Sequence, residues 1–167
     1  TPGSFNPYTS YIQFGNKIIF SATDGSNGFE PWITDGTSAG TILLKNIYSG
    51  SGSSFPGEYV VVGSKIVFSA TTANGREIWI TDGTSAGTVE FADINPGPLS
   101  SGPRNFVAYD TNKFFFTAFN PLTQFSTVYY ADVSTGVITS ADQALIATQS
   151  FASIGGLTVA DYGGFSY

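Results

Sequence analysis

The sequence repeats the segment Trp32-Ile33-Thr34-Asp35-Gly36-Thr37-Ser38-Ala39-Gly40-Thr41 letter for letter from Trp79 to Thr88. A second segment occurs three times in similar form, as Asn16–Ala22, Ser64–Ala70 and Asn112–Ala118. The lysines of these three segments, at positions 17, 65 and 113, are spaced 48 residues apart. Self-similarity at a fixed period of this length is the signature of a repeat architecture. The chain therefore contains about three copies of one unit of roughly 48 residues.

Each copy reads as four short strands joined by turn residues. In the second copy we expect strands at residues 58–62, 65–70, 77–81 and 88–94. Asn27-Gly28 and Asn74-Gly75 lie at matching places between the second and third strands, and Asn-Gly is the signature of a tight hairpin. Segments rich in Gly, Pro and Ser, at residues 48–57 and 95–103, separate the units.

The second strand of each unit indicates the architecture. Ile18–Phe20, Ile66–Phe68 and Phe114–Phe116 are continuous apolar runs, whereas a strand with one wet face alternates apolar and polar residues. A run without a polar face is buried on both sides, as happens when small sheets stack around an axis. We therefore predict an all-β chain of about three four-stranded antiparallel β-propeller-type blades, with Phe20, Phe68 and Phe116 in equivalent buried places. A β-sandwich is the alternative, and it explains the strict period less well.

We expect one repeat domain over residues 1–167, with blades at 8–48, 57–95 and 104–141. Residues 144–167 are expected to form a partial fourth blade or a closing segment. The start Thr1-Pro2-Gly3 matches the inter-blade segment Asn95-Pro96-Gly97, so another blade could end where this chain begins. Propellers typically need four to eight blades to close. The expected partners are therefore other copies of the chain or further blades of a longer chain.

The composition excludes several classes of function. The net charge is −6 and the six basic residues are scattered, which disfavours binding to nucleic acid or to an anionic membrane surface. No apolar run approaches the roughly 18–20 residues of a membrane span, so we expect no membrane insertion. The chain has no Cys, Met or His, and so lacks thiolates and the commonest general base. Together with the low charge, this composition favours a secreted or cell-surface protein.

The segment Glu77-Ile78-Trp79-Ile80-Thr81-Asp82-Gly83-Thr84 resembles the ELWxxDGT repeat family of bacteria. Residues 30–41 match it a second time, with Pro31 in place of the usual Leu, and the third copy keeps only Tyr129 and Asp132. The resemblance implies a propeller-like fold in secreted or surface-anchored proteins. It implies no defined activity.

The motif residues have a structural interpretation. An Asp carboxylate can accept the backbone N–H two residues on and close an Asx-turn, while the following Gly permits the required backbone. We therefore expect structural turns at the repeated Asp-Gly-Thr loops and at the degenerate third loop: Asp35, Gly36, Thr37, Asp82, Gly83, Thr84 and Asp132. Glu30 and Glu77 are expected at a hydrogen-bonded or solvated blade edge.

Three aromatic residues and one loop are the candidate binding residues. Trp32 and Trp79 are expected to pack between blades, with sugar stacking on exposed rings as the alternative, and Tyr129 is a third weak candidate for ligand binding. Asp24 and Asn27 form a weak calcium candidate that lacks the bidentate Glu of a full calcium loop, so a hairpin turn is favoured and no cofactor is expected.

No unique acid stands out from the repeat, so we expect no catalytic residue and no enzyme activity. The predicted function is that of a structural or adhesive module in a surface layer, sheath or filament. A lectin-like glycan-binding propeller is the alternative, and a fragment of a glycoside hydrolase that uses two carboxylates is a less favoured one. Loss of glycan binding in Trp32→Ala would favour the lectin, and ordered self-assembly without sugar would favour the scaffold.

Overall fold

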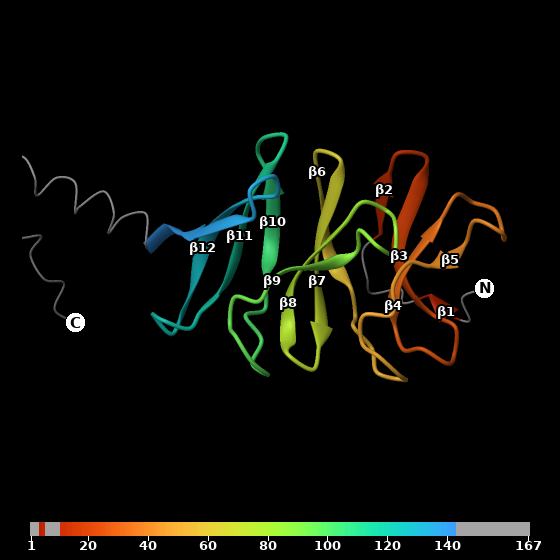
Figure 1. Cartoon of the computed structure of the whole chain (residues 1–167), viewed down its shortest axis with the longest axis horizontal. Coiled ribbons are helices and arrows are strands. Elements are labelled where there is room, and N and C mark those ends of the chain that lie inside the picture. The colour runs from red at the N-terminus through yellow and green to blue at the C-terminus, as the bar shows by residue number, and fades with distance from the viewer. Residues whose placement is uncertain (1–3, 6–10, 143–167) are drawn as a thin grey trace, which may run out of the picture.

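The computed structural model describes residues 4–5 and 11–142, and in these ranges the chain is β-structure with almost no helix. Three antiparallel sheets follow one another along the chain and stand side by side in chain order (Figure 1). No helix in the described ranges is both long enough and apolar enough to span a bilayer. The expected fourth unit at 144–167 lies outside the described residues.

The second and third sheets are four-stranded meanders. The second sheet has the order β6 (Gly57–Val62), β7 (Lys65–Thr72), β8 (Gly75–Thr81) and β9 (Val89–Ala92). The third sheet has the order β10 (Arg104–Ala108), β11 (Lys113–Asn120), β12 (Phe125–Asp132) and β13 (Val137–Ser140). The prediction of four-stranded antiparallel units is confirmed for both.

The first sheet has five strands, two of which lie end to end along one edge of the sheet. Its order is β3 (Lys17–Thr23), β4 (Glu30–Thr34) and β5 (Ile42–Leu43), and two short strands share the other edge of β3. β2 (Ile12–Phe14) pairs with the beginning of β3, and β1 (Ser4–Phe5) pairs with its end. β2 is three residues long and pairs only with the beginning of β3, while β1, which precedes the predicted start of the first unit at residue 8, pairs with the end of β3. Residue 8 lies outside the described residues.

The repeated residues occupy the same register in every sheet. Phe20 pairs with Trp32, Phe68 with Trp79, and Phe116 with Tyr129, in each case across the second and third strands. Phe68 and Phe116 are fully buried, as predicted, whereas Phe20 is half-buried.

Two apolar cores hold the sheets together. One lies between the first and second sheets and contains Ile19, Ile33, Phe68 and Trp79. The other lies between the second and third sheets. Phe68 belongs to the first core and its chain neighbour Val67 to the second. The second sheet is thus covered on both faces, which accounts for its continuous apolar strand.

The sheets converge along their first strands. β6 contacts β2 on one side and β10 on the other, while the last strands β5, β9 and β13 make no comparable contacts with one another among the described residues. This is the arrangement expected of sheets placed around an axis. The three described sheets form an open fan and do not close into a ring.

The two Asn-Gly segments differ in the structure. In the second sheet, Ala73 and Asn74 form a two-residue loop, and Gly75 pairs with Thr72. The predicted tight hairpin at Asn27-Gly28 is wrong, because residues 24–29 form a longer loop between β3 and β4. Gly28 is required there for a different reason, since a Cβ atom would lie 2.0 Å from the carbonyl oxygen of Gly52 in the segment that leads to the next sheet.

Candidate functional site

The loop between β8 and β9 is closed by side-chain hydrogen bonds. Asp82 Oδ1 accepts bonds from the N–H (3.0 Å) and the hydroxyl (2.6 Å) of Thr84. Thr84 Oγ1 in turn accepts the N–H of Gly87 (2.9 Å), and the hydroxyl of Thr88 donates to the carbonyl of Thr84 (2.6 Å). Gly83 has a φ of 84°, a region that L-residues with a side chain rarely adopt. The recurring letters therefore encode one hydrogen-bonded turn.

The first copy contains the same turn, and the third retains the bonds to its Asp carboxylate. Asp35 Oδ1 accepts the N–H (2.9 Å) and hydroxyl (2.7 Å) of Thr37, and Asp132 Oδ1 accepts the N–H (2.8 Å) and hydroxyl (2.5 Å) of Ser134. Gly36 has a φ of 91°. Hydrogen bonds from the Thr or Ser side chain lower the pKa of each carboxyl below its ordinary value.

Asp82→Ala is expected to lower the free energy of unfolding by about 1–2 kcal/mol, because it removes the acceptor of a local hydrogen-bond network. Urea unfolding measures the loss. Ser85→Ala, at an exposed position of the same loop, is the matched control and should change stability by less than about 0.5 kcal/mol. Equal effects of the two substitutions would contradict the structural role of Asp82.

The same turns predict a dependence on pH. Because the pKa of Asp82 is lower in the folded chain, the unfolded chain binds protons more readily. The stabilisation is present above the ordinary pKa of Asp, about 3.9, and is lost as the pH falls toward the folded value. Between neutral pH and acid, the wild-type chain should lose more stability than Asp82→Asn in urea unfolding. A parallel pH dependence of the two proteins would contradict this expectation.

The candidate aromatic residues are buried. Trp32, Trp79 and Tyr129 are 3%, 8% and 7% exposed. Trp79 belongs to the core between the first two sheets, and Tyr129 stacks on Phe116 with 5.1 Å between ring centroids. The tryptophan rings therefore present no open face to a sugar, whereas Tyr129 also borders a cavity.

The calcium candidates bond to each other and to neighbouring groups. Asp24 Oδ1 accepts the N–H of Ser26 (2.9 Å) and of Asn27 (2.7 Å), and its Oδ2 accepts the amide of Asn27 (2.9 Å). Asn27 Oδ1 accepts the amide of Asn46 (2.8 Å). Across residues 4–5 and 11–142, no three His, Cys, Asp or Glu side chains gather where they could hold a metal ion.

Glu30 and Glu77, expected at a hydrogen-bonded or solvated blade edge, are hydrogen-bonded but fully buried, with exposures of 0% and 1%. Glu77 Oε2 accepts the N–H of Ile94 (3.0 Å) and the hydroxyl of Ser101 (2.6 Å), while Oε1 accepts the N–H of Ser101 (2.6 Å). Burial raises the pKa of Glu77, and these hydrogen bonds act in the opposite direction. We call this arrangement the Glu clamp.

The first sheet has an equivalent Glu clamp. Glu30 accepts the N–H of Ile47 (2.9 Å), the N–H of Ser54 (3.0 Å) and the hydroxyl of Ser54 (2.7 Å), with a fourth bond from the N–H of Tyr48 (3.3 Å). The spacing from Glu to Ser is 24 residues in both copies. This shared spacing is the feature of the sequence from which the contact between Glu and Ser could have been predicted.

Each Glu clamp also reaches the following sheet. The carbonyl of Ser54 accepts the N–H of Thr71 in the second sheet (2.8 Å), and the carbonyl of Ser101 accepts the N–H of Phe119 in the third sheet (2.8 Å). In the third sheet the matching register position is Thr127, which pairs with Ala118 as Glu77 pairs with Ala70. The third copy therefore has no carboxylate for a clamp at this position.

The third sheet exposes an apolar face directed away from the second sheet. We define this outer face by Val107, Tyr109, Phe115, Val128, Tyr130 and Val137. Tyr109 and Phe115 stack with 4.6 Å between ring centroids, and Tyr130 lies 6.1 Å from each. Phe115 is 39% exposed, whereas its equivalents Ile19 and Val67 are 0% exposed. In the part of the chain that the structure describes, no sheet follows the third, so the position that a following sheet buries in the first two copies is partly exposed in the third.

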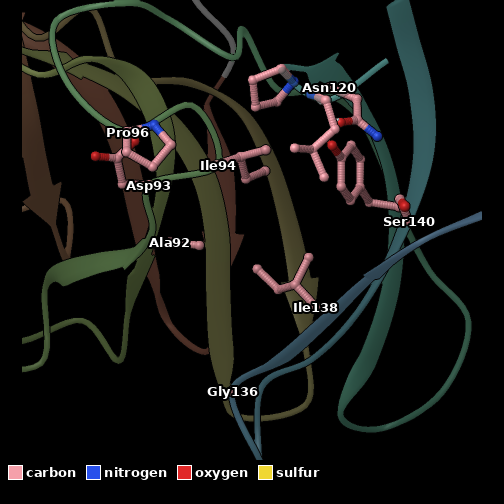
Figure 2. Close-up of a pocket in the computed structure, with 11 residues that line it drawn as sticks. Ala92, Asp93, Ile94, Pro96, Asn120, Gly136, Ile138 and Ser140 are labelled. Atoms are coloured by element: carbon pink, nitrogen blue, oxygen red, sulfur yellow. Dashed lines mark hydrogen bonds between the residues drawn. The ribbon is translucent and has the colours of Figure 1, made fainter. Parts of the chain in front are cut away.

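A cavity of about 540 Å³ lies between the second and third sheets. Figure 2 shows Asp93, Ile94 and Pro96 on one side and Asn120, Ile138 and Ser140 on the other. It is the larger of two cavities that occur at the same place in the repeat.

The comparison with solved structures finds a similarity in fold. The chain resembles AtxE2 isopeptidase in its apo form, with 12% sequence identity and a TM-score of 0.51. The match covers 89% of this chain and 30% of that chain, so this chain spans less than a third of the length of the isopeptidase. At this identity the similarity concerns the fold alone. No family model and no curated protein matches the sequence.

Proposed function

We propose that this chain is a non-enzymatic structural module of a secreted or cell-surface protein, in which sheets of one repeat stack on each other. In this proposal the sheets are consecutive blades of a propeller-like array of the ELWxxDGT type. Further sheets continue the array, either within a longer chain or by association of copies.

The outer face of the third sheet is the observation that carries this proposal. Phe115 occupies the register position at which Ile19 and Val67 are fully covered by the next sheet. Large exposed apolar patches on soluble proteins mark interaction surfaces. A further sheet of the same repeat matches this face, because such sheets already cover the equivalent faces of the first two.

The acidic residues at repeat positions support a structural role. Asp35, Asp82 and Asp132 close turns, and Glu30 and Glu77 bind the segments between sheets. The 167 residues contain no His and no Cys, so a pair of a nucleophile and an imidazole cannot be built from them. We therefore do not propose isopeptidase activity for this chain, whose similarity covers 30% of the solved enzyme.

Light scattering on the purified chain tests the proposal. We expect association that increases with concentration, in which a second copy supplies the sheet that covers the outer face. Phe115→Asp should shift the chain to monomer, because a buried carboxylate without a partner is costly. Leu99→Asp removes an apolar residue with 66% exposure in a segment between sheets and should leave association unchanged. A wild-type chain that stays monomeric at every soluble concentration would contradict the proposal.

A further inference from the structure

The cavity between the second and third sheets has a smaller counterpart between the first and second. The small cavity, of about 210 Å³, borders Ile47 and Thr72, and the large one borders Ile94 and Asn120 at the equivalent positions. Ile47 and Ile94 both donate their N–H to the Glu clamp 17 residues earlier. The same place in the repeat therefore holds cavities of different size.

Two positions that line the large cavity carry smaller side chains than their equivalents in the second sheet. In the second sheet Trp79 pairs with Glu90 across β8 and β9, and in the third sheet Tyr129 pairs with Ser140 at the equivalent register position. Both pairs lie on the face directed toward the preceding sheet. The third copy thus replaces a large aromatic and a long side chain by two smaller ones, and the cavity extends to both of them.

The walls of the cavity are of two kinds. Ile94, Leu122 and Ile138 supply apolar surface, together with two prolines. Asp93, at the exposed mouth, and Tyr129 supply polar groups. Asn120, which is 4% exposed, lies on the wall opposite Asp93. A concave site that combines apolar walls with a few polar groups is the usual form of a small-molecule site, and its volume falls in the usual range of about 300–1,000 Å³.

We propose that this cavity binds a neutral sugar residue of a glycan. The hydroxyl groups of a pyranose would bond to the carboxylate, amide and phenol on the walls, and its C–H face would pack on the isoleucines. Anionic ligands are disfavoured, because the cavity is lined by an acid and by no basic side chain, and the chain carries a net charge of −6. The proposal is independent of the structural role, since the cavity lies on the opposite face of the third sheet from the outer face.

Titration of the full chain with neutral trisaccharides, followed by NMR and calorimetry, tests the site. The probes are maltotriose, cellotriose, mannotriose and chitotriose. We expect at least one to bind saturably and to shift the resonances of Asn120 and Ile138. The double variant Tyr129→Trp/Ser140→Glu restores the pair present in the second sheet and fills the cavity. It should remain folded and bind at least about tenfold more weakly.

A matched variant separates the polar contact from the filled volume. Asp93→Asn places at the mouth the residue that the first copy has at its equivalent position, Asn46, and should weaken binding by roughly threefold to tenfold with the fold unchanged. Binding that the double variant leaves unchanged would overturn the location of the site. Absence of binding by all four trisaccharides would overturn the proposed ligand class.

Discussion

Glu77→Ala is expected to lower the free energy of unfolding by about 3–5 kcal/mol, the largest effect among the substitutions considered. The change removes the acceptor of three hydrogen bonds, from the N–H of Ile94 and from the N–H and hydroxyl of Ser101. Ser101 is 3% exposed and Ile94 is half-buried, so these donors would lose their partner without full access to water. Unfolding in urea measures the loss, and hydrogen exchange at Phe119 N–H should accelerate, because its acceptor is the carbonyl of Ser101.

Two variants make this test specific. Glu77→Gln keeps one carbonyl oxygen but turns an NH₂ group toward N–H donors, so an intermediate loss is expected. Glu58→Ala removes an exposed Glu of the same sheet, whose bond to the N–H of Asn105 is 3.2 Å, and should cost less than about 1 kcal/mol. If Glu77→Ala costs no more than Glu58→Ala, the Glu clamp does not hold the sheets together.

Gly63→Ala is expected to lower the free energy of unfolding by about 2–4 kcal/mol. Gly63 lies in the turn between β6 and β7, and its φ of 59° is strained for Ala. A Cβ atom there would lie 2.4 Å from the carbonyl oxygen of Thr111, in the equivalent turn of the third sheet. The substitution therefore has to displace one sheet from the next where their first strands converge.

Gly15→Ala is the matched control for this substitution. Gly15 occupies the same turn of the first sheet with a φ of 61°, but no atom lies within 4 Å of the position of its Cβ. It should lose only about 1 kcal/mol, the cost of a left-handed backbone in Ala. Thermal or urea unfolding compares the two variants, and equal losses would show that the close approach of the sheets does not contribute.

The period of the sequence predicted the sheets because each copy carries its own turn and strand signals. The apolar runs Ile66–Phe68 and Phe114–Phe116 indicated strands covered on both faces. This holds in the second sheet, while in the third sheet Phe115 is partly exposed. An apolar run shows that the strand is suited to be covered on both faces, but it does not show whether a following sheet is present to cover it. The partly exposed Phe115 is therefore the basis of the proposed function.

Several features could not be predicted because they depend on partners distant in the chain. The buried state of Glu77 is decided by Ser101, which lies 24 residues away in an irregular segment. The sequence predicted a tight hairpin at Gly28, but a Gly is needed there because the backbone of Gly52 lies too close for a side chain. β1 is two residues long, and so short a strand leaves no periodic signal.

The degenerate third copy was informative in a different way. The third copy keeps an aromatic residue, Tyr129, at the position of Trp79, but the sequence alone does not show that Tyr129 and Ser140 are paired on one face, as Trp79 and Glu90 are. Only the register of the sheets shows that the two replacements meet beside the same cavity.

The most direct test of the stacking proposal is the reactivity of a single thiol on the outer face of the third sheet. The chain has no Cys, so Val128→Cys, at a position with 46% exposure, gives one reporter, and Leu99→Cys gives the control. We predict that the thiol at position 128 reacts rapidly with a maleimide at low protein concentration and becomes protected as the chain associates, while that at position 99 stays reactive. Equal reactivity of both thiols at concentrations where light scattering detects association would contradict the account.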